Sequence, residues 1–472
     1  MSSTDLTAKL DEEDLVSPRD MVKSGLCIGC GSCVAQSGSC ASLMRLDPYG
    51  QFKPTGSQEW MRRRTHAFAL ICPFSPLAMN EDELAGRRFP NAPCAAASIG
   101  RFEAAYVGHV AEQDFRACGS SGGMVTWMAC ELLRQRLVDG VAHVTAKDGS
   151  EGRFFGYGIS RCEDEIRSGA KSRYYPVELA GVIEEMRSIP GRYAVIGIPC
   201  FIKALRLLQE QDPVLRERLV FTLGLFCGHM KSARMVESFA WQMGADTDAV
   251  RAVEFRLKDP DRPANWYTAQ LTLKDGSTPA QDWWHLADGD WGAGFFQNSA
   301  CNFCDDVVAE TADVSFGDAW VEPYSSDGRG TNVIIVRSPV VRELVASAIA
   351  EGRLSLKPVD SQFIEQTQAA GLRHRREGLA FRLLWPRFGV RPRKRVVPDA
   401  AGLPFRRKLI YVMRYQISAW SHCMFRLARI MKRPIIYIGW ARTVLALYHG
   451  LAYSRGRVGL IVERLKLPGG EN

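Results

Sequence analysis

The chain has 472 residues, 46% hydrophobic and 24% charged, which is ordinary for a soluble globular protein of two or three domains. No apolar run reaches the ~18 residues that a membrane-spanning helix needs, so we expect no transmembrane segment. The net charge of +8 is uneven: residues 405–468 hold thirteen Arg and Lys against one acid, which leaves a net charge of −4 on the rest.

The fourteen cysteines cluster with glycines, and the chain begins with a polar segment rather than a secretory signal peptide. We therefore expect a protein of the reducing cytoplasm, in which cysteines act as ligands or redox groups rather than as disulfides. Residues 1–20 are predicted to be a flexible arm.

Three cysteines follow one another at spacings of three in the sequence CIGCGSC, at Cys27, Cys30 and Cys33. Glycine allows the tight turns that bring three thiolates to one point, and this run is typical of a ferredoxin-type loop around a cubane iron–sulfur cluster. A zinc knuckle or a disulfide-rich loop is the alternative. The fourth ligand is Cys72 or Cys40, and we favour Cys72 because Pro73 follows it. Residues 21–100 are thus predicted to be an iron–sulfur N-terminal domain.

From residue 101 onward, apolar strand patterns alternate with amphipathic helix patterns, which indicates an α/β body with mainly parallel strands. The predicted strands are 103–110, 141–146, 193–198 and 219–226, and the predicted helices are 124–136, 178–187 and 201–209.

A loop of small residues, 119–123, opens the first of these helices. Bare backbone N–H groups and the helix dipole favour an anion there, and the pyrophosphate of a dinucleotide would fit. A tight glycine turn with a serine cap is the alternative. The segment 169–175 places two cations beside two tyrosines, which suits a phosphate and a planar ring. A solvated basic turn is the simpler interpretation of that segment.

A second set of cysteines follows the strands of the body. Cys200 and Cys227 each come at the end of a predicted strand, and Cys301 and Cys304 form a close pair. Because ends of parallel strands lie side by side, the four are expected to converge on a second cubane cluster or a structural zinc, which spacing alone does not separate.

Aromatic residues lie among glycines between positions 283 and 296. They line a pocket or simply pack under a loop. Asp318, His285 and Tyr174 are conceivable proton donors, but no catalytic residue is assigned.

Taken together, these motifs resemble the coenzyme F420 hydrogenase/dehydrogenase beta-subunit family. The resemblance covers residues 21–370 and rests on CIGCGSC at 27–33, SSGGMVTWMACELL at 120–133, VDGVAHV at 138–144, GAKSRYYPV at 169–177, GIPCFIKALR at 197–206, GLFCG at 224–228, CNFCDD at 301–306, ADVSFGDAW at 312–320 and GTNVIIVR at 330–337. The sequences CPFS, KSRYYPV and CNFCDD resemble the bacterial branch associated with surface polysaccharide formation.

The resemblance implies one or two [4Fe-4S] clusters and an FAD in a domain spanning 101–385. It implies cluster ligands at Cys27, Cys30, Cys33, Cys72, Cys200, Cys227, Cys301 and Cys304. It implies FAD contacts at Ser120, Ser121, Gly122, Gly123, Met124, Lys171 and Ser172. The expected function is an oxidoreductase that passes electrons between ferredoxin or coenzyme F420 and an unidentified small-molecule or glycan-related substrate. A non-catalytic electron-transfer or assembly partner of a polysaccharide pathway is the alternative.

The C-terminal part is predicted to be a linker, 386–404, followed by a basic helical tail, 405–472. The segments 405–415, 420–431 and 440–448 mix cations with aromatic and aliphatic residues, which suits a membrane surface carrying anionic lipid. A helical appendage packed on the body is the alternative. No nucleic-acid-binding module is recognised, so we expect no nucleic acid partner. The protein is expected to be cytoplasmic, with peripheral contact to the inner face of the membrane.

Overall fold

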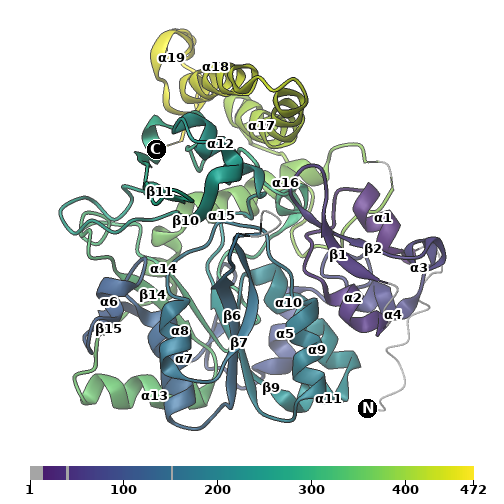
Figure 1. Ribbon diagram of the computed structural model, residues 1–472, viewed down its shortest axis with the longest axis vertical. Helices are drawn as coiled ribbons and strands as arrows, with labels where there is room; N and C mark the ends of the chain where they lie inside the picture. The colour runs from purple at the N-terminus through teal and green to yellow at the C-terminus, as the bar shows by residue number, and fades with distance from the viewer. Residues whose placement is uncertain (1–13, 39–41, 150–152, 388, 472) are drawn as a thin grey trace.

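A mixed eight-stranded sheet forms the centre of the protein in the computed structural model, which describes residues 14–38, 42–149, 153–387 and 389–471. The strand order is β15-β5-β14-β13-β9-β8-β6-β7 (Figure 1). The strands are β5 (Ala104–Val110), β6 (Gly140–Ala146), β7 (Phe155–Ser160), β8 (Tyr193–Gly197), β9 (Leu219–Leu225), β13 (Val314–Asp318), β14 (Asn332–Val336) and β15 (Leu354–Pro358).

The four central strands, β13, β9, β8 and β6, pair in parallel. The outer strands pair antiparallel, and β5 runs in the same direction as the central four. Five of the eight strands therefore share one direction. The α/β body with mainly parallel strands is confirmed, although β14 inside the sheet and the edge strands β15 and β7 run in the opposite direction.

Helices cover both faces of this sheet, as the alternating pattern predicts. One face packs against α7 (Met124–Arg134), α8 (Glu163–Ser168) and α13 (Pro339–Ala350). The other face packs against α9 (Ala180–Ser188) and α10 (Pro199–Gln211). Trp127 of α7 and Phe201 of α10 are fully buried, so each helix presents its apolar side to the sheet. Further helices in this part of the chain are α6 (Phe115–Cys118), α11 (Pro213–Arg218) and α12 (Arg234–Gln242).

The cysteine-rich segment before the sheet consists of short elements, and those of residues 18–71 lie at one side of the molecule (Figure 1). They are α1 (Pro18–Lys23), α2 (Ser32–Ser37), β1 (Leu43–Leu46), β2 (Phe52–Thr55), α3 (Gln58–Arg62), α4 (His66–Ile71), α5 (Glu81–Arg88), β3 (Cys94–Ala96) and β4 (Gly100–Phe102). Ser17 caps α1, and Val16 and Met21 are buried in the main core. The expectation of a flexible arm is therefore wrong for residues 16–20, and its first part, 1–13, lies outside the described residues.

A smaller sheet lies beside the large one, made of β10 (Val250–Glu254), β11 (Thr268–Leu273) and β12 (Ala280–Asp282). The short helix η3 (Thr247–Ala249) precedes it, and η4 (Trp283–His285) and η5 (Ser299–Phe303) follow it. Beyond β15, helices α14 (Ser361–Thr367), α15 (Ala369–Arg375) and α16 (Glu377–Leu383) lead toward the C-terminal helices.

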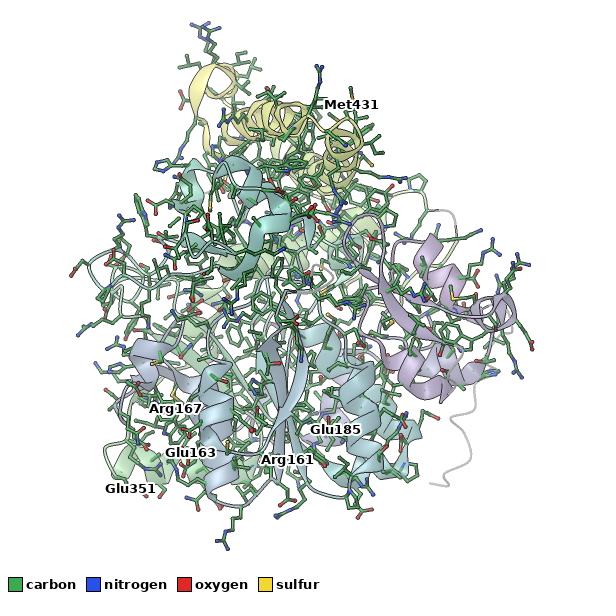
Figure 2. All side chains as sticks on the ribbon, viewed as in Figure 1. Arg161, Glu163, Arg167, Glu185, Glu351 and Met431 are labelled. Atoms are coloured by element: carbon green, nitrogen blue, oxygen red, sulfur yellow. The ribbon has the colours of Figure 1, made fainter. Side chains whose placement is uncertain are left out.

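The C-terminal region is helical, as predicted, and caps one end of the molecule (Figure 1). Helix α17 (Phe405–Ile430) joins two segments that the sequence suggested were separate, and α18 (Pro434–Tyr453) and α19 (Gly456–Arg464) follow. Figure 2 places Met431, between α17 and α18, at the outer surface. By length and composition alone, the segment Pro434–Arg464 is apolar enough to cross a membrane, contrary to our expectation, but such a segment is weak support for a membrane span.

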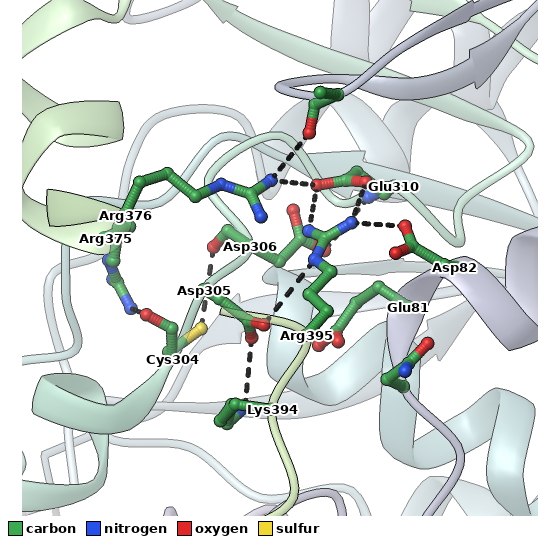
Figure 3. Close-up of polar contacts among 12 residues, drawn as sticks. Glu81, Asp82, Cys304, Asp305, Asp306, Glu310, Arg375, Arg376, Lys394 and Arg395 are labelled. Carbon is green, nitrogen blue, oxygen red and sulfur yellow. Dashed lines mark hydrogen bonds and ion pairs between the residues drawn. The ribbon is translucent and has the colours of Figure 1, made fainter. Parts of the chain in front are cut away.

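The region expected to be a linker, 386–404, is not a free connection. Lys394 and Arg395 are almost fully buried, with exposed side-chain fractions of 3% and 8%. Lys394 pairs with Asp305 and Arg395 with Glu310, so the segment is fastened to the body by buried charges (Figure 3).

Candidate functional site

The four N-terminal cysteines predicted to be ligands form one group. Cys27 and Cys30 lie in the loop before α2, Cys33 in α2, and Cys72 directly after α4. Burial raises the pKa of the Cys30 thiol to about 11. Burial also raises the pKa of Cys33 well above its ordinary value, and charges on Cys30, Cys27 and Cys72 add to the rise. Four thiols that repel one another when ionised are a set that a cationic metal centre would stabilise.

Two glycines allow the loop to fold this tightly. Gly29 has φ of +83°, and a Cβ there would lie 2.4 Å from the Phe52 carbonyl oxygen. Gly31 has φ of +86°, and a Cβ there would lie 2.7 Å from the Glu178 carboxylate and 2.9 Å from the Ala180 backbone nitrogen. Any other residue would displace the loop, so glycine is required by both conformation and space.

Cys72 lies with the N-terminal group, whereas Cys40 lies outside the described residues. We expect a Cys72→Ser variant of the anaerobically purified protein to lose iron equivalent to one cluster, because serine replaces a thiolate ligand. A Cys40→Ser variant should keep its iron. Colorimetric iron analysis of both proteins checks the assignment, and loss of iron from Cys40→Ser alone would reverse it.

The second set of four cysteines also converges. Cys200 is the second residue of α10, three residues after the end of β8, and Cys227 follows β9 by two residues. Both therefore lie at the carboxyl ends of neighbouring parallel strands. Cys301 lies in η5 and Cys304 caps it. All four line one small internal cavity. Burial, and next the charges of Cys304, Cys227 and Cys301, raise the pKa of Cys200 well above its ordinary value.

The two groups are neighbours. Ile28, between the first two cysteines of the N-terminal group, lines the small cavity of the second group, as does Phe74. A charge on Cys30 contributes to the raised pKa of Cys200.

Among the described residues, no three His, Cys, Asp or Glu side chains are placed to hold a single metal ion.

Arg375, at the end of α15, closes the second group. Its guanidinium donates hydrogen bonds to the carbonyl oxygens of Cys301 (3.1 Å), Cys304 (3.3 Å) and Cys227 (3.4 Å), and to that of Gly228. The side chain is only 2% exposed, and no carboxylate of the described residues lies within 4 Å of it. Burial lowers its pKa, but the four neighbouring thiolates raise it above the ordinary value of arginine.

A buried cation without a carboxylate partner is costly unless another anion compensates it. The groups whose negative charge raises the pKa of Arg375 are the four thiols of the second group, and Arg375 lines the same small cavity as they do. The donor set of four cysteines and one buried guanidinium therefore fits an anionic thiolate-ligated cluster.

A cavity of about 970 Å³ adjoins the second group. Ile198 and Cys227 line both this cavity and the small one. Six of the seven residues predicted to contact FAD line the large cavity: Ser120, Ser121, Gly123, Met124, Lys171 and Ser172. Gly122 lies behind them, where a Cβ would be 2.8 Å from the side-chain oxygen of Asn332.

The two predicted loops meet at the cavity wall. The Ser172 backbone N–H donates to the Ser120 hydroxyl at 2.8 Å, which joins the loop before α7 to the segment before α9. Gly123, with φ of +84°, occupies the N-cap position of α7. The Met124 N–H donates to Asn332 at 3.2 Å. The Lys171 ammonium pairs with Glu254 at 3.0 Å.

Other residues of the large cavity were predicted from the sequence only as one of two alternatives, or not at all. Trp283, Trp284 and Trp291 line the cavity, whereas Phe295 and Phe296 pack against the tail instead. Arg256 was not predicted from any motif. Its guanidinium donates to Asp318 at 3.0 Å inside the cavity and lies 4.3 Å from the ring centre of Tyr267.

Of the three conceivable proton donors, Asp318 and Tyr174 line the cavity. His285 is exposed and does not.

His229 and Lys231 were also missed, although they follow Cys227 at the end of a central strand, where ligand sites collect. The His229 ring stacks on Trp291 with ring centres 4.3 Å apart, and its Nε2 is buried without a hydrogen-bond partner. The Lys231 ammonium donates to the Phe295 carbonyl at 2.7 Å, and burial lowers its pKa to about 7.

The C-terminal helices complete the cavity wall with His449, Tyr453 and Arg455. His449 bonds to Asp290 at 2.7 Å, next to the cavity residue Trp291. The C-terminal helices thus pack on the body, as the alternative to a free membrane-binding tail predicted.

Two groups of four thiols beside one large cavity, on a mixed α/β sheet, define a candidate redox protein. Residues 105–184 match the N-terminal region, and residues 191–362 the C-terminal region, of the family described as the beta subunit of coenzyme F420 hydrogenase/dehydrogenase. The matches cover more than half of the chain, which belongs to the coenzyme F420 hydrogenase/dehydrogenase beta-subunit family. The family expected from the motifs is confirmed.

Two individual proteins from Methanosarcina barkeri are similar to this chain. Over 271 residues, the chain is 21% identical to the coenzyme F420 hydrogenase subunit beta of Methanosarcina barkeri, a match that covers 56% of this chain and 84% of that protein. A solved structure of the xenon-derivatized F420-reducing [NiFe] hydrogenase complex from Methanosarcina barkeri contains a chain with 17% identity and a TM-score of 0.49. That similarity covers 63% of this chain and 99% of the other.

Proposed function

We propose that this protein is an iron–sulfur flavoprotein oxidoreductase. It passes electrons between ferredoxin or coenzyme F420 and an unidentified small-molecule substrate, through [4Fe-4S] clusters and FAD. Clusters exchange single electrons and flavin exchanges one or two, so bound together they supply the conversion between one-electron and hydride chemistry. The observation that carries the proposal is that Cys227 and Ile198 line both the cysteine cavity and the large cavity.

The chain's own residues have three tasks in this function. The eight cysteines hold the clusters, and Arg375 compensates the charge of the second one while fixing the ligand loops through their carbonyls. The loop around Gly123 and the N-terminus of α7 receive the pyrophosphate, with Lys171 at the cavity wall. The aromatic wall around Trp291 and Tyr174 packs against planar rings and excludes water.

The proton needed by a reduced substrate is the task of a cavity acid. The carboxylate of Asp318 accepts a hydrogen bond from the guanidinium of Arg256 and is occupied by that contact. Lys231 is buried in the cavity wall with a pKa of about 7, so near neutral pH it can hold or release a proton at Nζ. Lys231 is thus the better candidate, although the sequence alone assigned no catalytic residue.

The electron partner belongs to the same proposal. The similar protein from Methanosarcina barkeri is a subunit of a coenzyme F420 hydrogenase, which supports exchange with F420 or with a partner subunit. We also propose a role in surface polysaccharide formation, which rests on the motifs CPFS, KSRYYPV and CNFCDD.

The proposal is tested by the absorption spectrum and the cofactor content of anaerobically purified protein. We expect flavin absorption near about 450 nm over a broad cluster band near about 400 nm, with up to about eight iron atoms per chain. Reduction by F420H2 or by reduced ferredoxin, followed at the flavin band, then identifies the donor. Colourless protein with stoichiometric zinc would contradict the proposal.

A Gly123→Ala variant tests the flavin site separately. Its Cβ would lie 2.5 Å from the Phe115 carbonyl oxygen at a φ of +84°, so the loop must move. Because a left-handed alanine alone costs about 1–2 kcal/mol, we expect flavin occupancy to fall about tenfold or more, with iron content unchanged. Gly181→Ala in α9, where a Cβ meets nothing within 4 Å, is the matched control. Equal flavin content in both variants would place the flavin elsewhere.

A further inference from the structure

The C-terminal helices expose an unusual amount of apolar surface. Of the 21 large apolar side chains that are exposed in the described part of the chain, twelve lie between Phe405 and Leu465. Single exposed apolar residues are common, but a contiguous set usually marks an interaction surface.

Six of these residues form an apolar stripe along α17. Their exposed fractions run from 36% to 69%, and their spacings of four, three, eight, seven and three keep them on one side of the helix. We call this set the α17 stripe: Phe405, Leu409, Val412, Trp420, Leu427 and Ile430. Met431, in the turn after α17 (Figure 2), is 50% exposed, and Ile435, at the start of α18, is 68% exposed; both continue the stripe.

The opposite side of α17 already has its partners. Ile410, Ile417 and Phe425 are buried in the main core. The Ser418 hydroxyl donates to the Gln297 carbonyl at 3.0 Å, and Ser421 accepts from the Phe296 N–H at 2.9 Å. The helix is therefore apolar on two sides, and packing onto the body explains only the inner one.

The charge around the stripe indicates what covers it. Residues 405–468 have thirteen cations and one acid, Glu463. Arg426, Arg429, Lys432 and Arg433 are exposed around the outer end of α17. Arg429 pairs with Glu237 of α12 at 3.1 Å, so Arg426, Lys432 and Arg433 are the cations that face outward without a carboxylate partner among the described residues. Arg406, Arg407 and Arg414 are largely buried, so the charge of this face comes from the exposed cations. A second copy of the chain would bring the same exposed cations against it, which opposes self-association through this face. A bilayer with anionic headgroups satisfies both the apolar stripe and the cations.

The same helices cannot leave the body to span a bilayer without exposing buried groups. Tyr437, Ala441 and Tyr448 of α18 are fully buried. The Tyr437 hydroxyl donates to the buried carboxylate of Asp288 at 2.9 Å. These contacts keep α18 on the protein, so a lipid contact must be made by the outer face alone.

We propose that the α17 stripe and its flanking cations dock this protein, as a peripheral protein, onto membrane surfaces that carry anionic lipid. This inference is independent of the proposed redox function. The predicted membrane contact thereby becomes smaller: it is one face of α17 and the turn that follows it, rather than the whole tail, 405–468.

The test is flotation of the full-length holoprotein with phosphatidylcholine vesicles, with or without about 30% phosphatidylglycerol. We expect binding to the anionic vesicles at low salt, little to the neutral ones, and release by high salt or by alkaline carbonate. A Leu427→Gln/Ile430→Gln variant should bind about tenfold or more weakly, because each buried CH₂ contributes about 0.8 kcal/mol. Val397→Gln, a 74% exposed apolar residue outside the tail, is the control and should bind like the native protein.

Three results would overturn the proposal. One is that the native protein fails to float with anionic vesicles at low salt. Another is that the stripe variant binds as tightly as the Val397→Gln control. The third is that the protein resists carbonate extraction, which would mean insertion across the bilayer. Light scattering adds a further arm: a dimer that the stripe variant abolishes, without vesicle binding, would assign the stripe to a protein interface instead.

Discussion

If the proposed two clusters are present, an Arg375→Gln variant is expected to lose the one held by Cys200, Cys227, Cys301 and Cys304, so that iron content falls to about half of the native value while the proposed N-terminal cluster stays. The physical reason is that the guanidinium holds four carbonyl oxygens of the ligand loops and is the cation that faces four thiolates. Each buried carbonyl left without a donor costs roughly 1–3 kcal/mol, and glutamine satisfies at most two of them.

Arg375→Lys separates the charge from the hydrogen bonds. It keeps a cation near the thiolates but loses the fork that reaches several carbonyls at once. We expect Arg375→Lys to keep part of its iron. The midpoint potential of its remaining second cluster, followed by EPR, should lie closer to the native value than the potential of any second cluster that survives in Arg375→Gln. The potential should be lower without the cation, because the reduced cluster carries the larger negative charge.

Arg382→Gln is the matched control. Arg382 is as buried as Arg375 and also donates to backbone carbonyls, those of His374 and of Asn302, which lies between Cys301 and Cys304. It thus holds the same loop, but it bonds to no cysteine and does not line the cysteine cavity. This variant should be less stable yet keep its full iron content. Equal iron loss in both variants would mean that Arg375 acts only as a structural residue.

The sequence contains much of the information on the body and its cysteines. The strands β5, β6, β8 and β9 and the helices α7, α9 and α10 lie where apolar periodicity placed them, within a few residues. Parallel pairing brings Cys200 and Cys227 together because residues that follow neighbouring parallel strands meet at one edge of the sheet. A local pattern and one topological rule are sufficient for this part.

Arg375 could not be found in the same way. It lies in a basic stretch, Arg373, His374, Arg375, Arg376, which by composition is typical of a solvated helix end. Its role depends on α15 approaching η5 and the end of β9, and no local pattern encodes that approach. The role of a buried cation such as Arg375 depends on partners that are far away in the sequence.

The C-terminal tail is a second part of the chain whose contacts could not be predicted from the sequence alone. Its composition predicted amphipathic helices, and helices are present. The composition did not separate the apolar residues that pack on the body, such as Phe425, from those left on the surface, such as Ile430, since both sides of α17 are apolar. Only the three-dimensional packing makes that distinction.

An Arg395→Ala variant is expected to lower the free energy of unfolding by about 3–5 kcal/mol, the cost of removing one partner from a buried ion pair. Its guanidinium bonds to Glu310 at 2.6 Å and Asp82 at 2.7 Å, and lies 3.5 Å from Asp305 (Figure 3). Glu310 and Asp305 are 1% and 0% exposed, so water cannot replace the lost cation. Arg376 and Lys394 remain as partners, which keeps the expected loss near this range rather than above it.

Arg393→Ala, two residues earlier, is the matched control. Arg393 also forms an ion pair, with Glu83 of α5, but the two side chains are 45% and 38% exposed. An exposed pair contributes about 0–1 kcal/mol, so urea unfolding of this variant should nearly match that of the native protein. Limited trypsin digestion provides a second measurement: Arg395→Ala should be cut between residues 386 and 404, whereas the native protein and the control should resist. If the two variants unfold and are digested alike, the segment is the simple linker that its composition suggests, and its ion pairs with Asp305 and Glu310 do not fasten it to the body.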